Sequence, residues 1–325
     1  MPKPQPNELF TALRAGDTVA LSRAITLVES SRAEHRKQAE VLLQLCLPYA
    51  GRSFRIGITG VPGVGKSTLI EQLGLLAIAK DHSVAVLAVD PSSRKTGGSI
   101  LGDKTRMEKL SVHPRAFIRP SAAGTTLGGV AGSTREAIIL LEAAGYDLIL
   151  VETVGVGQSE TAVHSMTDLF LLLLLSGAGD ELQGIKRGIM EMADIVAVNK
   201  ADGDNVIRAD QTRMDFKRAL HLFPPPASGW TVPVLTCSAL TGTGMEHLLE
   251  QIMDYRTFVN SNGFLERNRS RQLQYWFHES LQQQLMNQLT ERFPDDVEAA
   301  SQAVLEGREL PSAAIAALLN RLFSR

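Results

Sequence analysis

Seven short apolar segments constrain the fold of this chain more than any other feature of its sequence. They are residues 54–59, 84–90, 116–119, 147–153, 169–175, 195–199 and 232–237. Most of them are continuously apolar rather than alternating, which is typical of strands buried on both faces of a parallel sheet. The stretches between most of them are long enough for crossover helices. The sequence therefore predicts a doubly wound α/β domain with a mostly parallel sheet, and ligands are expected beyond the carboxyl ends of its strands.

Helical periodicity marks the segments on both sides of this region. In the first fifty residues, Leu21, Ile25 and Val28 recur near helical spacing, and Gly16 with Asp17 separates this helix from a shorter one before it. The character of the chain changes again after residue 260. The prediction is an N-terminal helical segment, the α/β domain and a C-terminal helical arm, over residues 1–50, 51–260 and 261–325.

The C-terminal arm carries an apolar stripe whose members recur every four residues. They are Leu273, Phe277, Leu281, Leu285 and Leu289. A helix of this kind must bury its stripe either on its own domain or on a second copy of the chain. Pro294 and Pro311 then divide the remaining residues into two further short helices.

Composition excludes several functional classes. The 33 Lys plus Arg and 35 Asp plus Glu leave a net charge of −2, so neither nucleic acid nor an acidic membrane surface is an expected partner. Cys46 and Cys237 form no Cys-x-x-Cys pair and are expected to be reduced thiols. The N-terminal MPKPQPNELF lacks the apolar stretch of a signal peptide, and the longest apolar run, 169–175, is far below the ~20 residues that span a bilayer. We therefore expect a cytoplasmic protein without a membrane partner.

A phosphate-binding loop follows the first apolar segment. The residues GVPGVGKS match the pattern G-x-x-x-x-G-K-[ST], after the strand FRIGIT and before an apolar helix. Its glycines let backbone N–H groups turn towards phosphates, Lys66 adds positive charge at the β- and γ-phosphates, and the Ser67 hydroxyl can ligate Mg²⁺. The sequence therefore predicts a nucleoside triphosphate site. Its candidate contact residues are Gly60, Val61, Pro62, Gly63, Val64, Gly65, Lys66, Ser67 and Thr68.

A second motif favours guanine over adenine. Asn199, Lys200 and Asp202 form the pattern N-K-x-D at the end of an apolar strand. A carboxylate at this point accepts two hydrogen bonds from guanine, whereas adenine presents a lone pair there, a difference of ~1–3 kcal/mol by analogy with bidentate base contacts. A polar helix cap would give the same letters. The next strand ends in residues that complete a base pocket, Ser238, Ala239 and Leu240.

Together with ETVGVGQ at 152–158 and the stretch SGAGDELQGIKRGIMEMAD, these motifs resemble those of the metallochaperone-type P-loop GTPases of the SIMIBI class. That family carries Glu, here Glu152, in place of the usual Asp of its third nucleotide motif. Within it, nearly the whole chain most resembles the MeaB/ArgK branch, the GTPase chaperones associated with methylmalonyl-CoA mutase.

The resemblance implies a homodimeric, Mg²⁺-dependent GTPase that binds GTP and GDP. It also implies a role in gating the loading and protection of an adenosylcobalamin enzyme, methylmalonyl-CoA mutase. An older description of the branch, a kinase for lysine/arginine/ornithine transport, is the alternative. A kinase needs an acceptor site and usually a base, and nothing in the sequence marks either.

Three acids join Ser67 as candidates for the magnesium site. Glu152 ends the strand YDLILVE, and its carboxylate can reach the Mg²⁺ shell, through water where needed. Asp90 and Asp103 resemble the family's acids on the Mg²⁺ side. For these two the alternatives remain open, because Asp90 can cap a strand end and Asp103 can begin a helix.

Two glycine-containing segments resemble the switches of the family. Gly155 would let a backbone N–H approach the γ-phosphate. Residues 177–186 resemble the third switch, although an ordinary loop before a helix would give a similar sequence. With Lys66 and Glu152, the candidate catalytic residues are then Asp180 and Lys186.

The water that attacks the γ-phosphate has no obvious partner at the usual position. The residue after Gly155 is Val156, which neither donates nor accepts a hydrogen bond. Gln158, Asp180 or Lys186 is expected to position the water instead. We therefore predict slow intrinsic hydrolysis, on the order of 10⁻³–10⁻² s⁻¹, with acceleration by the mutase.

Overall fold

The computed structural model describes residues 5–89, 107–120, 127–153, 159–176 and 187–323. The chain forms two compact units, residues 1–270 and 271–325. The N-terminal helices belong to the same unit as the sheet. The predicted segment boundaries after residues 50 and 260 stay predictions.

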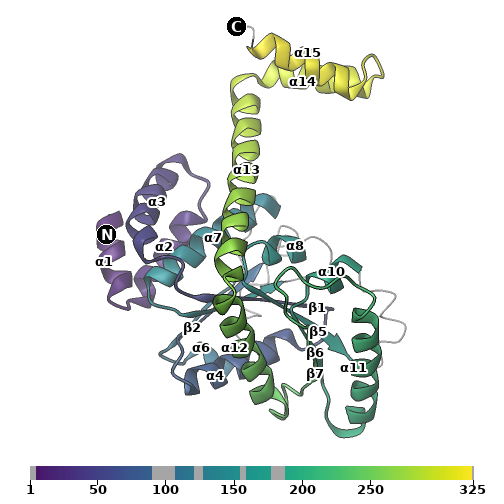
Figure 1. Ribbon diagram of the computed structural model, residues 1–325. Helices are drawn as coiled ribbons and strands as arrows, with labels where there is room; N and C mark the ends of the chain where they lie inside the picture. Colours follow the sequence, from purple (N-terminus) through teal and green to yellow (C-terminus); the bar gives the residue numbers. More distant parts are fainter. Residues whose placement is uncertain (1–4, 90–106, 121–126, 154–158, 177–186, 324–325) are drawn as a thin grey trace. The chain divides into compact units, whose positions relative to one another are not determined.

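A seven-stranded sheet lies at the centre of the first unit (Figure 1). Its order is β3-β2-β4-β1-β5-β6-β7, and every neighbouring pair is parallel. The chain starts near the middle of the sheet and adds strands on both sides, so the predicted doubly wound α/β fold is confirmed. The strands are β1 Phe54–Gly60, β2 Val84–Val89, β3 Ala116–Arg119, β4 Leu148–Thr153, β5 Leu169–Leu175, β6 Ile195–Asn199 and β7 Val234–Thr236.

Helices cover both faces of this sheet (Figure 1). Ile56 and Ile58 of β1 pack into a core with helices α4 and α12, whereas Val196 and Val198 of β6 turn to the opposite face and pack with α10 and α11. Helices α7 and α8 contact β1, β2 and β4. The bounds of the helices on the sheet are α4 Lys66–Ala79, α6 Glu108–Ser111, α7 Leu127–Ala143, α8 Ser159–His164, α10 Arg187–Met192, α11 Val206–Leu220 and α12 Met245–Ser261, and a 3₁₀ turn η2 spans Gly203–Asn205.

The strand ends differ from the sequence prediction by one or two residues. Asp147 lies just before β4, where its carboxylate accepts the Ser83 N–H at 2.7 Å and contacts His82 Nδ1 at 2.6 Å. Strand β7 is shorter than the predicted 232–237, since Pro233 has no N–H to donate to a strand ladder. Asp90, predicted to end the second strand, lies outside the described residues.

Three helices precede the sheet: α1 Pro6–Arg14, α2 Thr18–Val28 and α3 Ala33–Cys46, followed by a 3₁₀ turn η1 Leu47–Tyr49. The predicted break between the first two is confirmed. Gly16 adopts a φ of 88°, and the Asp17 carboxylate caps α2 by accepting the N–H groups of Val19 and Ala20 at 2.8 and 3.0 Å. Arg14 donates to the Ala143 carbonyl of α7 at 2.7 Å, which fixes these helices to the sheet domain.

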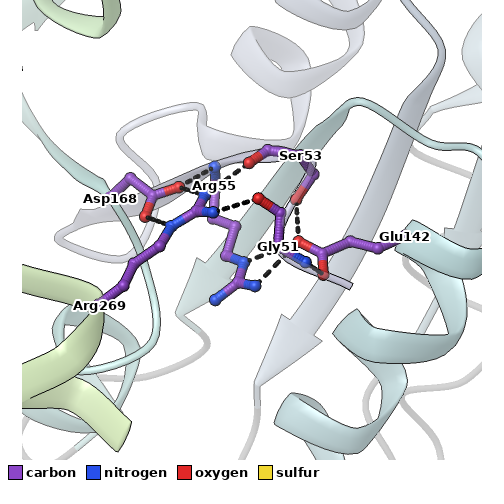
Figure 2. Close-up of polar contacts among 6 residues, drawn as sticks. All are labelled: Gly51, Ser53, Arg55, Glu142, Asp168 and Arg269. Atoms are coloured by element: carbon purple, nitrogen blue, oxygen red, sulfur yellow. Dashed lines mark hydrogen bonds and ion pairs between the residues drawn. The ribbon is translucent and has the colours of Figure 1, made fainter. Parts of the chain in front are cut away.

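A buried polar network lies at the amino ends of β1 and β5 (Figure 2). The Asp168 carboxylate accepts the Arg55 backbone N–H at 2.8 Å and the Arg269 Nε and Nη2 at 2.8 and 2.6 Å. Arg269 also donates to the carbonyl oxygens of Gly51 at 2.5 Å and Ser53 at 2.6 Å. Burial alone would lower the pKa of the Arg269 guanidinium, but its hydrogen bonds and ion pair with Asp168 raise it. The first residues of helix α13 (Phe264–Arg292) are thereby fixed to the sheet.

Glu142 at the end of α7 completes this network. Its carboxylate accepts the Gly51 N–H and the Ser53 hydroxyl, both at 2.5 Å, and pairs with Arg55 at 2.9 Å. The side chains of Glu142 and Asp168 are fully buried. Each buried carboxylate therefore has charged and neutral donors, which is the condition under which a buried charge is tolerated.

The second unit contains the rest of α13 together with α14 (Pro294–Leu305) and α15 (Pro311–Phe323). Both short helices begin at the predicted prolines, which suit the first helical position. An ion pair of 3.0 Å joins Arg321 to Asp296. None of the described helices is long and apolar enough to cross a membrane.

Candidate nucleotide-binding site

The phosphate loop connects β1 to α4 and depends on two glycines. Gly65 has a φ of 94°, and a Cβ atom there would lie 2.7 Å from Asn199 Nδ2. A Cβ at Gly60 would lie 2.6 Å from the Leu173 carbonyl oxygen. The backbone conformation of these two residues and the close approach of neighbouring atoms both require glycine. The loop can therefore follow this path only with the glycines that the motif specifies.

Lys66 is the first residue of α4, and its ammonium group is bound inside the loop. Lys66 Nζ donates to the Gly60 carbonyl at 2.8 Å, with the Val61 carbonyl at 3.4 Å. Burial lowers the pKa of Lys66, while the charges of Glu152 and Glu160 act in the opposite direction. The lysine is thus a half-buried cation held by neutral carbonyls, which an anionic ligand can replace.

Ser67 and Glu152 bring two oxygen donors together beside this lysine. Glu152 is the penultimate residue of β4 and is buried, and its Oε1 lies 3.5 Å from Ser67 Oγ. A hydroxyl and a carboxylate are oxygen ligands of the kind that Mg²⁺ takes in nucleotide sites. These two predicted residues are therefore brought together, with the chemistry that a magnesium ion needs.

Asn199 joins the phosphate loop to the loop after β7. Its Nδ2 donates to the Val64 carbonyl at 2.8 Å, and its Oδ1 accepts the Ala239 N–H at 3.1 Å. The buried thiol of Cys237 also lies 3.8 Å from this oxygen. A single side chain that is almost fully buried thus sets the spacing between the two predicted halves of the site.

The second half of the site contains the acid predicted to recognise guanine. The Ser238 hydroxyl donates to Asp202 Oδ2 in a short hydrogen bond, and it accepts the Thr241 N–H at 3.2 Å. Lys200 adopts a φ of 60°, which is rare for a residue with a side chain. Leu240, which was predicted to complete the base pocket, is exposed. The structure therefore brings Asp202 to Ser238 and leaves one carboxylate oxygen of Asp202 outside this bond.

Several predicted site residues lie outside the described residues. They are Asp90, Asp103, Gly155, Gln158, Asp180 and Lys186. Their roles in metal binding, in switching and in positioning water stay predictions.

Comparison with known proteins identifies the family. A family model described as methylmalonyl Co-A mutase-associated GTPase MeaB matches residues 21–293. The chain belongs to the MeaB family. The resemblance inferred from its motifs is thereby confirmed.

Individual relatives of this MeaB family chain cover most of its length. It is 45% identical over 282 residues to GTPase ArgK of Escherichia coli, covering 87% of this chain and 85% of the relative. It is 41% identical over 331 residues to the mitochondrial methylmalonic aciduria type A homolog of Mus musculus, covering 98% and 80% of the two chains. A crystal structure described as LAO/AO transport system kinase matches with a TM-score of 0.78 at 36% identity, covering 98% and 97%.

Sequence reasoning missed three buried polar residues near the phosphate loop of this MeaB family chain. Glu160 on α8 is buried, and its negative charge acts to raise the pKa of Lys66. The Thr153 hydroxyl lies 3.0 Å from the Thr59 hydroxyl, and both threonines are buried. The only available sequence signal was the position of each residue, because Glu160 follows the ETVGVGQ stretch and each threonine ends an apolar strand.

Proposed function

We propose that this chain is a GTP-binding and GTP-hydrolysing chaperone that gates adenosylcobalamin loading and protection of methylmalonyl-CoA mutase. One observation carries the nucleotide part of the proposal. Asn199 bonds to the phosphate loop through Val64 and to the base loop through Ala239, so the two halves of a nucleotide site have a fixed separation. Membership of a family described as mutase-associated GTPases supports the partner.

Binding of the triphosphate would use the backbone N–H groups of residues 60–68 and the charge of Lys66. The ammonium group is bound to the Gly60 carbonyl at 2.8 Å, and a β- or γ-phosphate oxygen is a stronger, charged acceptor for it. Exchange of the carbonyl for the phosphate keeps the half-buried ammonium group paired. It also provides positive charge where negative charge increases during phosphoryl transfer.

Ser67 Oγ and Glu152 fit a magnesium ion, with Asp90 and Asp103 as further candidates. When bound, the ion would neutralise charge on the β- and γ-phosphates. The part of this chain is to keep the hydroxyl and the carboxylate on the same side of the phosphate loop, 3.5 Å apart. Most of the remaining coordination positions would be filled by phosphate oxygens and water.

Guanine recognition would use Asp202, with Ser238 as its support. The Ser238 hydroxyl bonds to one carboxylate oxygen and so restricts the rotation of the Asp202 side chain. The stem of the exposed Lys200 can cover the base. Adenine has neither N–H donor at the corresponding positions, so this arrangement supports GTP as the nucleotide.

Slow turnover is part of the proposal. Gly155 would contribute the backbone N–H of the switch, while Gln158, Asp180 or Lys186 would position the water. In this scheme the mutase accelerates hydrolysis by acting on residues 177–186 so that the Lys186 charge comes near the γ-phosphate. A group supplied in this way is worth about 10³–10⁵-fold in related GTPases.

We further propose that the chain acts as a homodimer through the stripe of α13. Leu273, Phe277, Leu281 and Leu285 are 69%, 64%, 44% and 49% exposed. An apolar stripe of this length is unfavourable in water, which supports burial against a second copy with two-fold symmetry. Replacing Phe277 and Leu281 by Glu should give a monomer that still binds nucleotide, whereas a wild-type monomer at micromolar concentration in light scattering would contradict the dimer.

One experiment separates this function from the kinase alternative, which the family description does not favour. Release of inorganic phosphate from GTP is measured in single turnovers with and without the mutase, in parallel with transfer of labelled γ-phosphate to protein. We expect slow release that the mutase accelerates and no labelled protein. Labelled acceptor protein, or a release rate that the mutase leaves unchanged, would contradict the chaperone GTPase.

A further inference from the structure

A buried pair of threonine hydroxyls lies beneath the phosphate loop. Thr153 Oγ1 is 3.0 Å from Thr59 Oγ1 and 3.4 Å from the Ile58 carbonyl oxygen. Thr153 is 0% and Thr59 2% exposed. The hydroxyl of Thr153 has one proton to donate, and the shorter contact makes Thr59 its main acceptor.

The pair joins the two strands that end at the candidate site. Thr59 is followed by Gly60, whose carbonyl accepts the Lys66 ammonium group, and Thr153 follows Glu152. The parallel register of β1 and β4 runs from Phe54 with Leu148 to Ile58 with Glu152. The hydroxyl contact therefore lies one residue beyond the last backbone pair and holds the strands together where the loop begins.

Strand geometry links this contact to the direction of Glu152. Successive side chains of a strand point to opposite faces, so Glu152 and Thr153 leave β4 on opposite sides. The Thr153 contact restrains the backbone between them and thereby the position from which the Glu152 carboxylate reaches towards Ser67, 3.5 Å away. We propose that Thr59 and Thr153 are positioning residues, which hold Glu152 in place for the divalent cation that accompanies the nucleotide.

Packing alone does not require hydroxyls at these two positions. The residues before them in the two strands are mostly apolar, as in RIGI of β1 and LILV of β4, and valine has nearly the shape of threonine. A buried hydroxyl is costly to desolvate and is retained at little net gain when it is paired. Removal of a direct hydrogen-bond partner of a metal ligand typically weakens metal binding about 10–100-fold. Thr59 and Thr153 act on Glu152 through the backbone, so we expect an effect at the lower end of that range.

The inference rests on the proposed nucleotide site, and cation affinity tests it without relying on turnover. Mn²⁺ replaces Mg²⁺ in the GDP-bound protein, and its affinity is measured by electron paramagnetic resonance titration. Thr153→Val and Thr59→Val should each weaken Mn²⁺ binding by about tenfold or more, and the double variant should be no weaker than either. Thr153→Ser keeps the hydroxyl and should restore most of the affinity.

Thr167→Val is the matched control. Thr167 is also buried, and its hydroxyl donates to the Val163 carbonyl at 2.9 Å, but it lies just before β5 at the opposite end of the strands. Its substitution should leave Mn²⁺ affinity unchanged. Wild-type affinity in both valine variants at 59 and 153, or an equal loss in Thr167→Val, would overturn the proposal. A wild-type protein that binds GDP and Mn²⁺ normally but releases no phosphate from GTP would instead overturn the hydrolytic function and leave this inference standing.

Discussion

Charged residues are paired differently at the two ends of the parallel strands. We call the end that carries the phosphate loop the carboxyl edge of the sheet, and the end that carries Asp168 and Arg269 the amino edge. At the carboxyl edge, the Lys66 ammonium group is held by neutral carbonyl oxygens at 2.8 and 3.4 Å, and Ser67 and Glu152 are 3.5 Å apart. At the amino edge, Asp168 accepts three hydrogen bonds of 2.6–2.8 Å, two of them from the guanidinium group of Arg269. The first set can exchange its partners for a ligand, whereas the second set is already complete.

This difference separates function from stability within one sheet. Lys66 can move to a phosphate at little cost, because its ammonium group exchanges neutral carbonyl oxygens for a charged acceptor. Arg269 and Asp168 have no comparable substitute, since a buried charge that loses its partner is left in a medium of low polarity. We therefore expect substitutions at the carboxyl edge to change activity with little effect on stability, and substitutions at the amino edge to do the reverse.

The largest expected effect is the loss of hydrolysis in Lys66→Ala. Removal of the only phosphate-loop lysine should lower the single-turnover rate by at least about 10²–10³-fold, the range seen when one preorganised donor is removed from a transition state. The midpoint of thermal unfolding should change little, because the side chain is bound to loop carbonyls rather than packed in the core. Unfolding of this variant at a much lower temperature would contradict the separation of the two edges.

At the amino edge, Asp168→Ala should lower the free energy of unfolding by about 3–5 kcal/mol, because the partly buried Arg269 guanidinium loses its counter-charge. Chemical denaturation measures this change. The affinity of the remaining folded protein for GTP should stay within about twofold of wild type. Asp210→Ala removes a surface ion pair with Arg213 as a control and should cost no more than about 0.5 kcal/mol. A loss of GTP affinity in Asp168→Ala would show that the edges are coupled.

The two edges also differ in how well the sequence predicted them. The carboxyl-edge motifs are contiguous, so GVPGVGKS and N-K-x-D could be recognised by spacing alone, and the seven strands were located within one or two residues. The amino-edge network combines residues from 51 to 269 that have no common spacing. The strand order and the contact between Asn199 and Val64 could not be read from the sequence either, because side-chain pairing across parallel strands depends on the tertiary arrangement.

A smaller effect is expected for Asp202→Asn, which tests the base half of the carboxyl edge. The amide cannot accept two hydrogen bonds from guanine, so GTP affinity should fall by about 1–3 kcal/mol, or roughly 5–150-fold. Affinity for xanthosine triphosphate should rise, because its additional carbonyl accepts from the new NH₂ group. Calorimetry with both nucleotides measures the change, and Asp204→Asn, an exposed neighbour, serves as the control. Equal binding of ATP and GTP by the wild-type protein would rule out this pocket.

The last expected effect, at most about 1.4 kcal/mol for each pH unit, is a pH dependence of stability that originates at the amino edge. Asp194 precedes β6, and its carboxyl accepts the Phe170 N–H and the Tyr255 hydroxyl, each at 2.9 Å. Burial raises the pKa of Asp194 from 3.8 to about 7, with the Phe170 and Tyr255 hydrogen bonds opposing the shift and the Asp168 charge adding to it. The folded protein therefore retains a proton that the unfolded chain releases above about pH 4.

The sign of this pH dependence follows from proton binding. Between about pH 4 and 7 the folded state binds more protons at Asp194 than the unfolded state, so its contribution to stability falls as the pH rises, by at most about 1.4 kcal/mol per unit. Asp194→Asn mimics the protonated acid and should remove this contribution. The difference in unfolding free energy between variant and wild type should thus shift in favour of Asn from pH 5 to pH 7 and level off above it, while GTP affinity stays the same in both. A difference that does not change with pH would mean that Asp194 is ionised throughout, and that the amino edge tolerates one more buried charge than its hydrogen bonds account for.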